Sequence, residues 1–238
     1  VVESVHLETS TGFVENIKAA MIRGFLETDR NLLAEGYLRG GATATTAYLR
    51  GGRIWVANVG DCRAVMREAG DAKALTHDHR LDKAEERDAV ERRGGKIVKV
   101  KGISRVQGVL GVSRALGDRD LKEYITAEPE VFSGLVSETS EFLILGTDGL
   151  WDVVGNMEAT DVVAQAMAAA SGVSNGRNGT DAASRELVDL ARARGSRDDI
   201  SVLIVELLEY RMTPASSPRG KGKVADRGRA FSDKYEFF

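Results

Sequence analysis

Three short β-prone runs, separated by tight turns, constrain the fold of this 238-residue chain more than any other feature. The runs cover 43–49, 53–59 and 62–66, and the turns are Arg-Gly-Gly at 50–52 and Gly-Asp at 60–61. Alternating or β-branched residues bounded by glycine turns are typical of antiparallel hairpins. The spacing therefore predicts a three-stranded antiparallel meander over 43–66.

Strand and helix patterns follow in separate groups along the rest of the chain. The predicted helices are 12–34, 83–93, 158–170 and 181–194, and the further predicted strands are 96–100, 141–146 and 200–207. Residues 102–120 are predicted to be rich in loops, and 171–180 to be a surface loop. Because strands and helices do not alternate strictly, an α+β sandwich is favoured over a doubly wound sheet. Residues 209–238, rich in Ser, Gly, Lys and Arg, are predicted to be a disordered basic tail.

Composition excludes several classes of protein and limits the chemistry of any metal site. With 33 Lys and Arg against 36 Asp and Glu, the chain lacks the positive excess of a general nucleic-acid or membrane-surface binder. No apolar run approaches the roughly 20 residues that cross a bilayer. A single Cys excludes a Cys-rich metal centre, and three His disfavour a His-dominated one. Any bound metal must therefore rest mainly on carboxylates.

Four aspartates stand where predicted strands meet tight turns. They are Asp61, Asp148, Asp152 and Asp198. Oxygen ligands without His or Cys suit Mg²⁺ or Mn²⁺, and such a site is typical of metal-assisted hydrolysis of phosphate esters. The alternative is that Gly-Asp and Asp-Gly are ordinary turn dipeptides and that Asp152 caps the helix that follows it. Spacing alone leaves both interpretations open.

Several separate blocks resemble, in the same order, motifs of the PP2C (PPM) family of metal-dependent protein serine/threonine phosphatases, with a plant-like pattern. The blocks are GATA at 41–44, ANVGDCRAV at 57–65, THDH at 76–79, GGKI at 94–97, RVQGVLGVSRALGD at 105–118, FLILGTDGLWDV at 142–153 and GSRDDISV at 195–202. The resemblance covers roughly 13–208. It implies a phosphatase domain over 1–208, folded as a four-layer αββα sandwich of two antiparallel sheets flanked by helices.

The resemblance also implies roles for individual residues. Asp148 and Asp198 match ligands of a catalytic pair of Mg²⁺ or Mn²⁺ ions, and Asp61, Asp148 and Asp152 match a weaker third metal site. Thr43 matches a threonine near the metal cluster, and Arg105 an arginine near a flap that borders the substrate. Asp148, Asp198, Thr43 and Arg105 are therefore the predicted catalytic residues.

The implied reaction is hydrolysis of phosphoserine and phosphothreonine in proteins by metal-activated water, without a phosphoenzyme. The expected partners are phosphorylated proteins, with no nucleic acid and no membrane, and a monomer is expected. The cytoplasm or the nucleus is the default compartment. Cys62, His77 and His79 are predicted to have structural or hydrogen-bonding roles and not to act as nucleophile or ligands.

One departure from the family concerns its N-terminal motif, because no Asp-Gly-His occurs in this chain. The expected domain is then N-terminally incomplete and lacks the family's bridging aspartate and phosphate-binding arginine. We expect the chain alone to bind Mn²⁺ weakly and to lose about 10³-fold or more in turnover. Two functions stay open: a phosphatase, or a pseudophosphatase that acts as a protein-interaction module. Retention of all four aspartates favours the enzyme.

Overall fold

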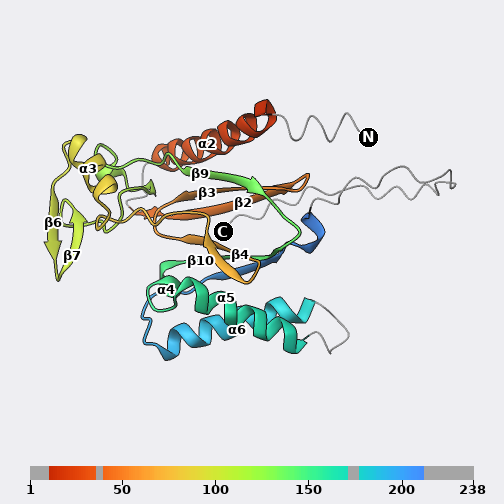
Figure 1. Cartoon of the computed structure of the whole chain (residues 1–238). Coiled ribbons are helices and arrows are strands. Elements are labelled where there is room, and N and C mark those ends of the chain that lie inside the picture. The colour runs from red at the N-terminus through yellow and green to blue at the C-terminus, as the bar shows by residue number, and fades with distance from the viewer. Residues whose placement is uncertain (1–10, 36–39, 171–176, 212–238) are drawn as a thin grey trace.

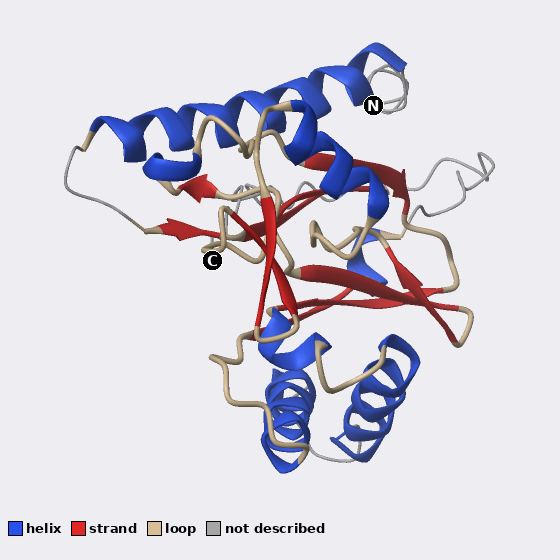
Figure 2. Cartoon of the chain, turned by 90° about the vertical axis from the view of Figure 1, so that its left-hand side faces the viewer, coloured by secondary structure: helices blue, strands red, loops and turns tan. Residues whose placement is uncertain are grey.

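Two antiparallel sheets lie face to face, and helices cover their outer surfaces (Figure 1). The structure is a computed structural model, and it describes residues 11–35, 40–170 and 177–211. Helix α2 (Thr11–Ala34) covers one sheet, while α5 (Asn156–Ala170) and α6 (Arg177–Ala193) cover the other. Figure 2 shows α2 and the α5–α6 pair on opposite sides of the sheets. The predicted α+β fold, a four-layer αββα sandwich, is confirmed.

The first sheet has the strand order β2-β3-β9. Its strands are β2 (Ala44–Arg50), β3 (Arg53–Val59) and β9 (Glu130–Leu135). Strands β2 and β3 form the predicted hairpin, and Gly51 and Gly52 adopt φ values of 56° and 73° at its turn, which favour glycine. Strand β9 falls where no strand was predicted, and it pairs with the other edge of β3.

The second sheet has the strand order β11-β10-β4-β5. Its strands are β4 (Arg63–Glu68), β5 (Asp71–Ala74), β10 (Ser140–Gly146) and β11 (Val202–Glu206). The predicted meander is wrong at its second turn, because β4 pairs with β5 and β10 and not with β3. Both β3 and β4 are largely buried, so the backbone groups on both of their edges need partners within a sheet. Gly60, at φ 97°, turns the chain from one sheet into the other.

Three apolar clusters hold the sandwich together, and two of them lie on the two faces of the second sheet. The third, between α2 and the first sheet, contains Phe25, Ala57, Val59, Leu116 and Ala127. The cluster between the sheets contains Ile54, Val56, Ala64, Met66, Leu75, Val136, Leu143 and Leu207. The cluster between the second sheet and its helices contains Val65, Phe142, Ile144, Leu150, Trp151, Val154, Ala159, Val163, Ala166, Ala183, Leu187, Ala191 and Ile204. Neighbouring residues of β4 and β10 alternate between the two clusters, as side chains of a strand with two covered faces must. Full burial of one such Leu or Ile contributes about 1.5–3 kcal/mol.

A third packed unit projects from one end of the sandwich and is called the flap unit here (Figure 1). It contains α3 (Ala84–Arg92), β6 (Ile97–Val100) and β7 (Ile103–Val106). The predicted charged helix and the strand after it are confirmed, and Gly94 at φ 83° follows the end of the helix. The unit has its own core, made of Leu81, Val90, Val106, Val112, Ala115, Leu121 and Ile125.

The remaining short elements connect these layers. They are β1 (Gly41–Ala42), which pairs with β8 (Leu116–Gly117), the 3₁₀ turns η1 (Arg119–Leu121) and η2 (Leu208–Tyr210), and α4 (Asp148–Trp151). The four long helices and the strands predicted at 96–100, 141–146 and 200–207 are present with shifted ends. The predicted loop at 171–180 is wrong for 177–180, which lie in α6, where helix–helix packing extends the helical backbone.

The chain remains part of the fold up to Arg211. The Arg211 guanidinium donates two hydrogen bonds to the carbonyl of Ser140, at 2.8 and 2.6 Å, so residues 209–211 of the predicted tail lie against the second sheet. Residues 212–238 lie outside the described residues, as do 171–176 of the predicted loop. Within the described ranges, none of the helices has the length and apolarity that a bilayer crossing needs.

Candidate active site

The ends of three neighbouring strands bring the predicted aspartates to one edge of the second sheet. Gly146, the last residue of β10, lies opposite Arg63 of β4 on one side and Val202 of β11 on the other. Asp61 comes two residues before Arg63, and Asp148 comes two residues after Gly146. Asp198 comes shortly before β11, and Asp152 follows the end of α4. The antiparallel register therefore gathers side chains that are far apart in the sequence.

Helix α4 and the loop before β11 are held together by backbone contacts. The Thr147 hydroxyl donates to the carbonyl of Asp199 at 3.1 Å and accepts from the amide of Ser201 at 3.1 Å. The Ser196 hydroxyl donates to the carbonyl of Gly149 at 2.7 Å. A Cβ atom at Gly149 would lie 2.4 Å from the Asp199 carbonyl oxygen, so the two segments approach as closely as only glycine allows. This contact positions the segment that carries Asp198 beside the start of α4.

Arg80, which no sequence pattern had indicated, lies among three of the four carboxylates. Its Nε lies 3.0 Å from Asp61 Oδ2, and its two terminal nitrogens lie 2.7 Å from Asp152 Oδ1 and 3.5 Å from Asp148 Oδ2. A guanidinium group carries five N–H donors in a planar fork, which suits it to bridge several carboxylates. Arg80 lies on the segment between the second sheet and the flap unit, and its carboxylate partners are distant in the sequence. Only the tertiary structure shows that these side chains meet.

Two carboxylates of the cluster, those of Asp148 and Asp61, are harder to ionise than usual. Burial raises the pKa of Asp148 to about 6, with further contributions from the charges of Asp61, Asp198 and Asp152 that outweigh Arg80. Burial also raises the pKa of Asp61, although Arg80 lowers it. The charge of one guanidinium therefore does not balance the negative charge of the cluster. Binding of a further cation or of a proton remains favourable there.

Asp198 faces the same space from the other side. A cavity of about 360 Å³ is lined by Asp148, Gly149, Asp152, Val153, Gly195, Ser196, Arg197 and Asp198. The chemistry of these oxygen donors fits Mg²⁺ or Mn²⁺. As they stand, however, the described residues contain no group of three or more His, Cys, Asp or Glu arranged to hold a metal ion. The structure therefore brings the predicted ligands together, but their oxygen atoms are not arranged to surround a cation.

Asp61 lies between β3 and β4, in residues 60–62, called the β3–β4 corner here. A buried histidine supports this corner. The amide of Gly60 donates to His79 Nδ1 at 3.0 Å, and the amide of His79 donates back to the Gly60 carbonyl at 3.0 Å. The Asn58 side chain donates to the same carbonyl at 3.1 Å. Burial, with the charge of Arg114, lowers the pKa of His79 to about 4, so the ring is neutral at pH 7 and Nδ1 can accept. The predicted hydrogen-bonding role of His79 is confirmed.

The other predicted residues lie close to the corner or in the flap unit. Thr43 packs against Gly60, and its Oγ1 lies 3.2 Å from the sulfur of Cys62. Cys62 is buried and burial raises the pKa of its thiol, as expected of a structural residue. Arg105 lies in β7, where it donates to the carbonyl of Val109 at 2.6 Å. The His77 ring lies 2.8 Å from Glu130 and is exposed.

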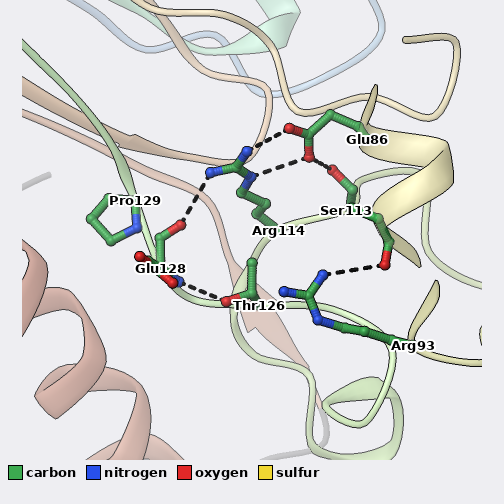
Figure 3. Close-up of a pocket in the computed structure, with 8 residues that line it drawn as sticks. Glu86, Arg93, Ser113, Arg114, Thr126, Glu128 and Pro129 are labelled. Carbon is green, nitrogen blue, oxygen red and sulfur yellow. Dashed lines mark hydrogen bonds and ion pairs between the residues drawn. The ribbon is translucent and has the colours of Figure 1, made fainter. Parts of the chain in front are cut away.

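A second cavity, of about 260 Å³, lies beside α3 and has a different chemistry (Figure 3). Figure 3 shows Glu86 between Ser113 and Arg114, and Arg114 Nη2 lies 2.5 Å from Glu86 Oε1. Burial raises the pKa of Glu86, but the hydrogen bonds from Arg114 and Ser113 outweigh it and leave the pKa lowered. The Ser113 amide also donates to the carbonyl of His79 at 3.0 Å. These contacts hold His79, which in turn supports the corner between β3 and β4. The Glu86 carboxylate is occupied by its hydrogen bonds and is not free to act as a base.

Comparisons with known proteins agree with this arrangement. The model of the family described as protein phosphatase 2C matches residues 2–200. The chain is 44% identical over 195 residues to the Arabidopsis thaliana protein named probable protein phosphatase 2C 30, covering 82% of this chain and 48% of that protein. It is 44% identical over 191 residues to probable protein phosphatase 2C 32 of Oryza sativa subsp. japonica, covering 80% and 47%.

Solved structures show the same fold. A serine-threonine phosphatase 2C from Toxoplasma gondii superimposes with a TM-score of 0.62 at 26% identity, covering 82% of this chain and 65% of that one. A C. elegans sex determining protein, at 24% identity, shares the fold with a TM-score of 0.67 over 86% of this chain and 50% of that one. The chain spans about half the length of the curated relatives it matches. Motifs, fold and relatives agree that this chain belongs to the protein phosphatase 2C family.

Proposed function

We propose that the protein hydrolyses phosphoserine and phosphothreonine in phosphorylated proteins in a reaction that depends on Mg²⁺ or Mn²⁺. The observation that carries the proposal is the meeting of Asp61, Asp148, Asp152 and Asp198 at the ends of three adjacent strands. Family membership supports it, as does the related Toxoplasma gondii protein named a serine-threonine phosphatase. The catalytic domain is proposed to cover 1–208, with residues 209–211 packed against its second sheet, and to be followed by a basic tail.

In this proposal, Asp148 and Asp198 would hold the catalytic pair of ions, and Asp61 and Asp152 would join Asp148 at a weaker third site. Bound Mg²⁺ or Mn²⁺ would neutralise the phosphate and lower the pKa of a water molecule that attacks phosphorus. Thr43 supports the corner that carries Asp61. Arg105 is proposed to orient the substrate from the margin of the flap unit.

The chain contributes positioning more than chemistry of its own. Asp148 is the first residue of a helix that directly follows a central strand, so its carboxylate has little freedom to move. The contact between Gly149 and Asp199 sets the separation of Asp148 from Asp198. Errors of about 1 Å in such a separation can lower a rate by about 10²-fold.

The proposal is tested by phosphate release from a phosphothreonine peptide in millimolar Mn²⁺. We expect release that EDTA abolishes and that Asp148→Asn and Asp198→Asn each lower by about 10²-fold or more. Asp189→Asn, which changes an exposed carboxylate of α6, serves as the matched control and keeps the wild-type rate. Release that is independent of Mn²⁺, or unaffected by both variants, contradicts the proposal. Peptide binding without release identifies a non-catalytic interaction module instead.

A further inference from the structure

Arg80 is the charged residue of the site to which the motifs assign no role. Its guanidinium contacts three carboxylates from two segments: Asp61 on the β3–β4 corner, and Asp148 and Asp152 at the start and just after the end of α4. We propose that Arg80 is a built-in competitor of the divalent cation, because its guanidinium and the cation exclude each other at Asp61, Asp148 and Asp152. This inference rests on the proposed function, since it concerns the same carboxylates.

The distances support exclusion. Mg²⁺ binds oxygen ligands at about 2.0–2.1 Å, so an ion shared by the three carboxylates must sit between their facing oxygens. The same oxygens, Asp61 Oδ2, Asp148 Oδ2 and Asp152 Oδ1, lie 3.0, 3.5 and 2.7 Å from nitrogens of Arg80. A positively charged group and a divalent cation cannot share these oxygens without strong repulsion at such short range.

The side chain of Arg80 can leave without a change in the fold. Its backbone forms a bridge with Val112, its amide donates to the Asp78 carbonyl at 2.9 Å, and the preceding His79 is clamped to Gly60. The side chain is still 29% exposed, so it reaches the carboxylates from the solvent side. Displacement therefore requires only a rotation of the side chain, while the corner with Asp61 stays in position.

The arrangement has a consequence for the metal-free protein. Asp148 and Asp61 repel each other and both are partly buried, so the cluster needs a positive charge to stay assembled. Arg80 supplies that charge when no divalent cation is bound. The same contacts must be broken when the cation binds, and this weakens the apparent affinity for the cation.

The first test measures Mn²⁺ affinity of the full chain by titration calorimetry. We expect Arg80→Gln to bind Mn²⁺ at least about tenfold more tightly than wild type, because one competing charge is removed. Arg80→Lys keeps the charge but loses the planar fork, and its affinity should lie between the two. Arg67→Gln is the matched control, since Arg67 pairs with Asp161 and Glu141 and not with this cluster, and it should stay within about twofold of wild type.

The main readout of the second test does not depend on a variant. In the wild-type chain, the Nε–H signal of Arg80 is followed by NMR during titration with diamagnetic Mg²⁺. We expect the protected, ion-paired signal to shift and to lose protection from solvent exchange as Mg²⁺ saturates the site. In the absence of metal, Arg80→Gln should also unfold at a lower temperature than wild type. Bound Mg²⁺ should remove this difference in unfolding temperature.

The outcomes separate this inference from the proposed function. Unchanged or weaker Mn²⁺ binding by Arg80→Gln, while Asp148→Asn abolishes binding, overturns the competitor role and leaves the metal site standing. An Arg80 signal that Mg²⁺ saturation does not move overturns it as well. If neither wild type nor Arg80→Gln binds Mn²⁺ at millimolar concentration, the inference and the proposed metal site fail together.

Discussion

Asp148 is the residue where burial and charge act on the same carboxylate. Its side chain is only 32% exposed, and it faces Asp61 on the β3–β4 corner, Asp152 on α4 and Asp198 on the loop before β11. Arg80 is the cation that faces it. Burial and the three negative charges outweigh Arg80 and raise the pKa of Asp148 to about 6. The folded, metal-free protein is therefore destabilised by ionising this group.

The sign of the pH dependence follows from that shift. Above about pH 6, Asp148 is charged in both the folded and the unfolded chain, and its charge favours the unfolded chain. Between about pH 6 and 4, Asp148 is protonated in the folded chain only. Asp148→Asn should therefore stabilise the metal-free chain at pH 8 by about 1–2 kcal/mol, a value reduced for solvent screening. The gain should largely disappear near pH 4. Urea unfolding in EDTA at both pH values measures it.

The matched control is Asp189→Asn, whose side chain is 77% exposed. It removes the same charge and should change stability little at either pH. A destabilised Asp148→Asn at pH 8, or a difference that is equal at pH 8 and pH 4, contradicts the assigned cause.

At the scale of elements, the site depends on the packing of α4 against the loop before β11. Helix α4 has four residues, too few to be stable by itself, and gains its stability from contacts with its neighbours. The Thr147 hydroxyl and the Ser196 hydroxyl tie the loop to it, and Gly149 lets the two backbones touch. The position of Asp198 is thus a property of this contact and not of the loop alone.

A methyl group at Gly149 tests this dependence. Gly149→Ala places Cβ 2.4 Å from the Asp199 carbonyl oxygen, so the backbone must move. We expect a loss of about 2 kcal/mol or more in unfolding free energy, typical of overpacking, and weaker Mn²⁺ binding. Thermal unfolding and calorimetry measure the two effects.

Gly155→Ala is the control for this change, because a Cβ atom there meets nothing within 4 Å and the backbone is not left-handed. It should alter the unfolding free energy by no more than about 1 kcal/mol and leave Mn²⁺ binding unchanged. If Gly149→Ala behaves in the same way as Gly155→Ala, the close approach does not position Asp198.

At the scale of the whole molecule, the two sheets are joined by the apolar cluster between them. Leu143 of β10 is fully buried in that cluster, which also contains Ile54 and Val56 of β3. Leu143→Ala should cost about 2–5 kcal/mol, since it removes buried methyl groups and leaves a cavity between sheets that cannot collapse freely. Denaturant unfolding measures the cost.

Leu208→Ala gives the comparison, because Leu208 is 58% exposed and its truncation should cost less than about 1 kcal/mol. Equal effects of the two substitutions would show that the space between the sheets is not the main core. A loss at Leu143 alone supports the cluster between the sheets as a main source of stability.

Local features of the sequence determined much of the fold. The four-residue spacing of apolar side chains predicts α2, and the glycine pair at 51–52 predicts the β2–β3 hairpin, because both depend on neighbours within a few residues. The aspartates next to glycine turns marked the site for a similar reason, since a strand end followed by a turn holds a side chain in place. Motif order identified the family, which the comparisons then showed.

Only the tertiary structure decided which strands pair and how charge is balanced at the site. A Gly-Asp turn can join two strands of one sheet or pass between two sheets. The choice depends on burying both faces of β3 and both faces of β4 against distant elements. Strand β9 and the role of Arg80 were missed for the same reason. The residues that pair along β3 and β9, and those that join Arg80 to Asp61, Asp148 and Asp152, lie 19 to 82 positions apart in the sequence. A local sequence pattern does not contain the free energy of such contacts.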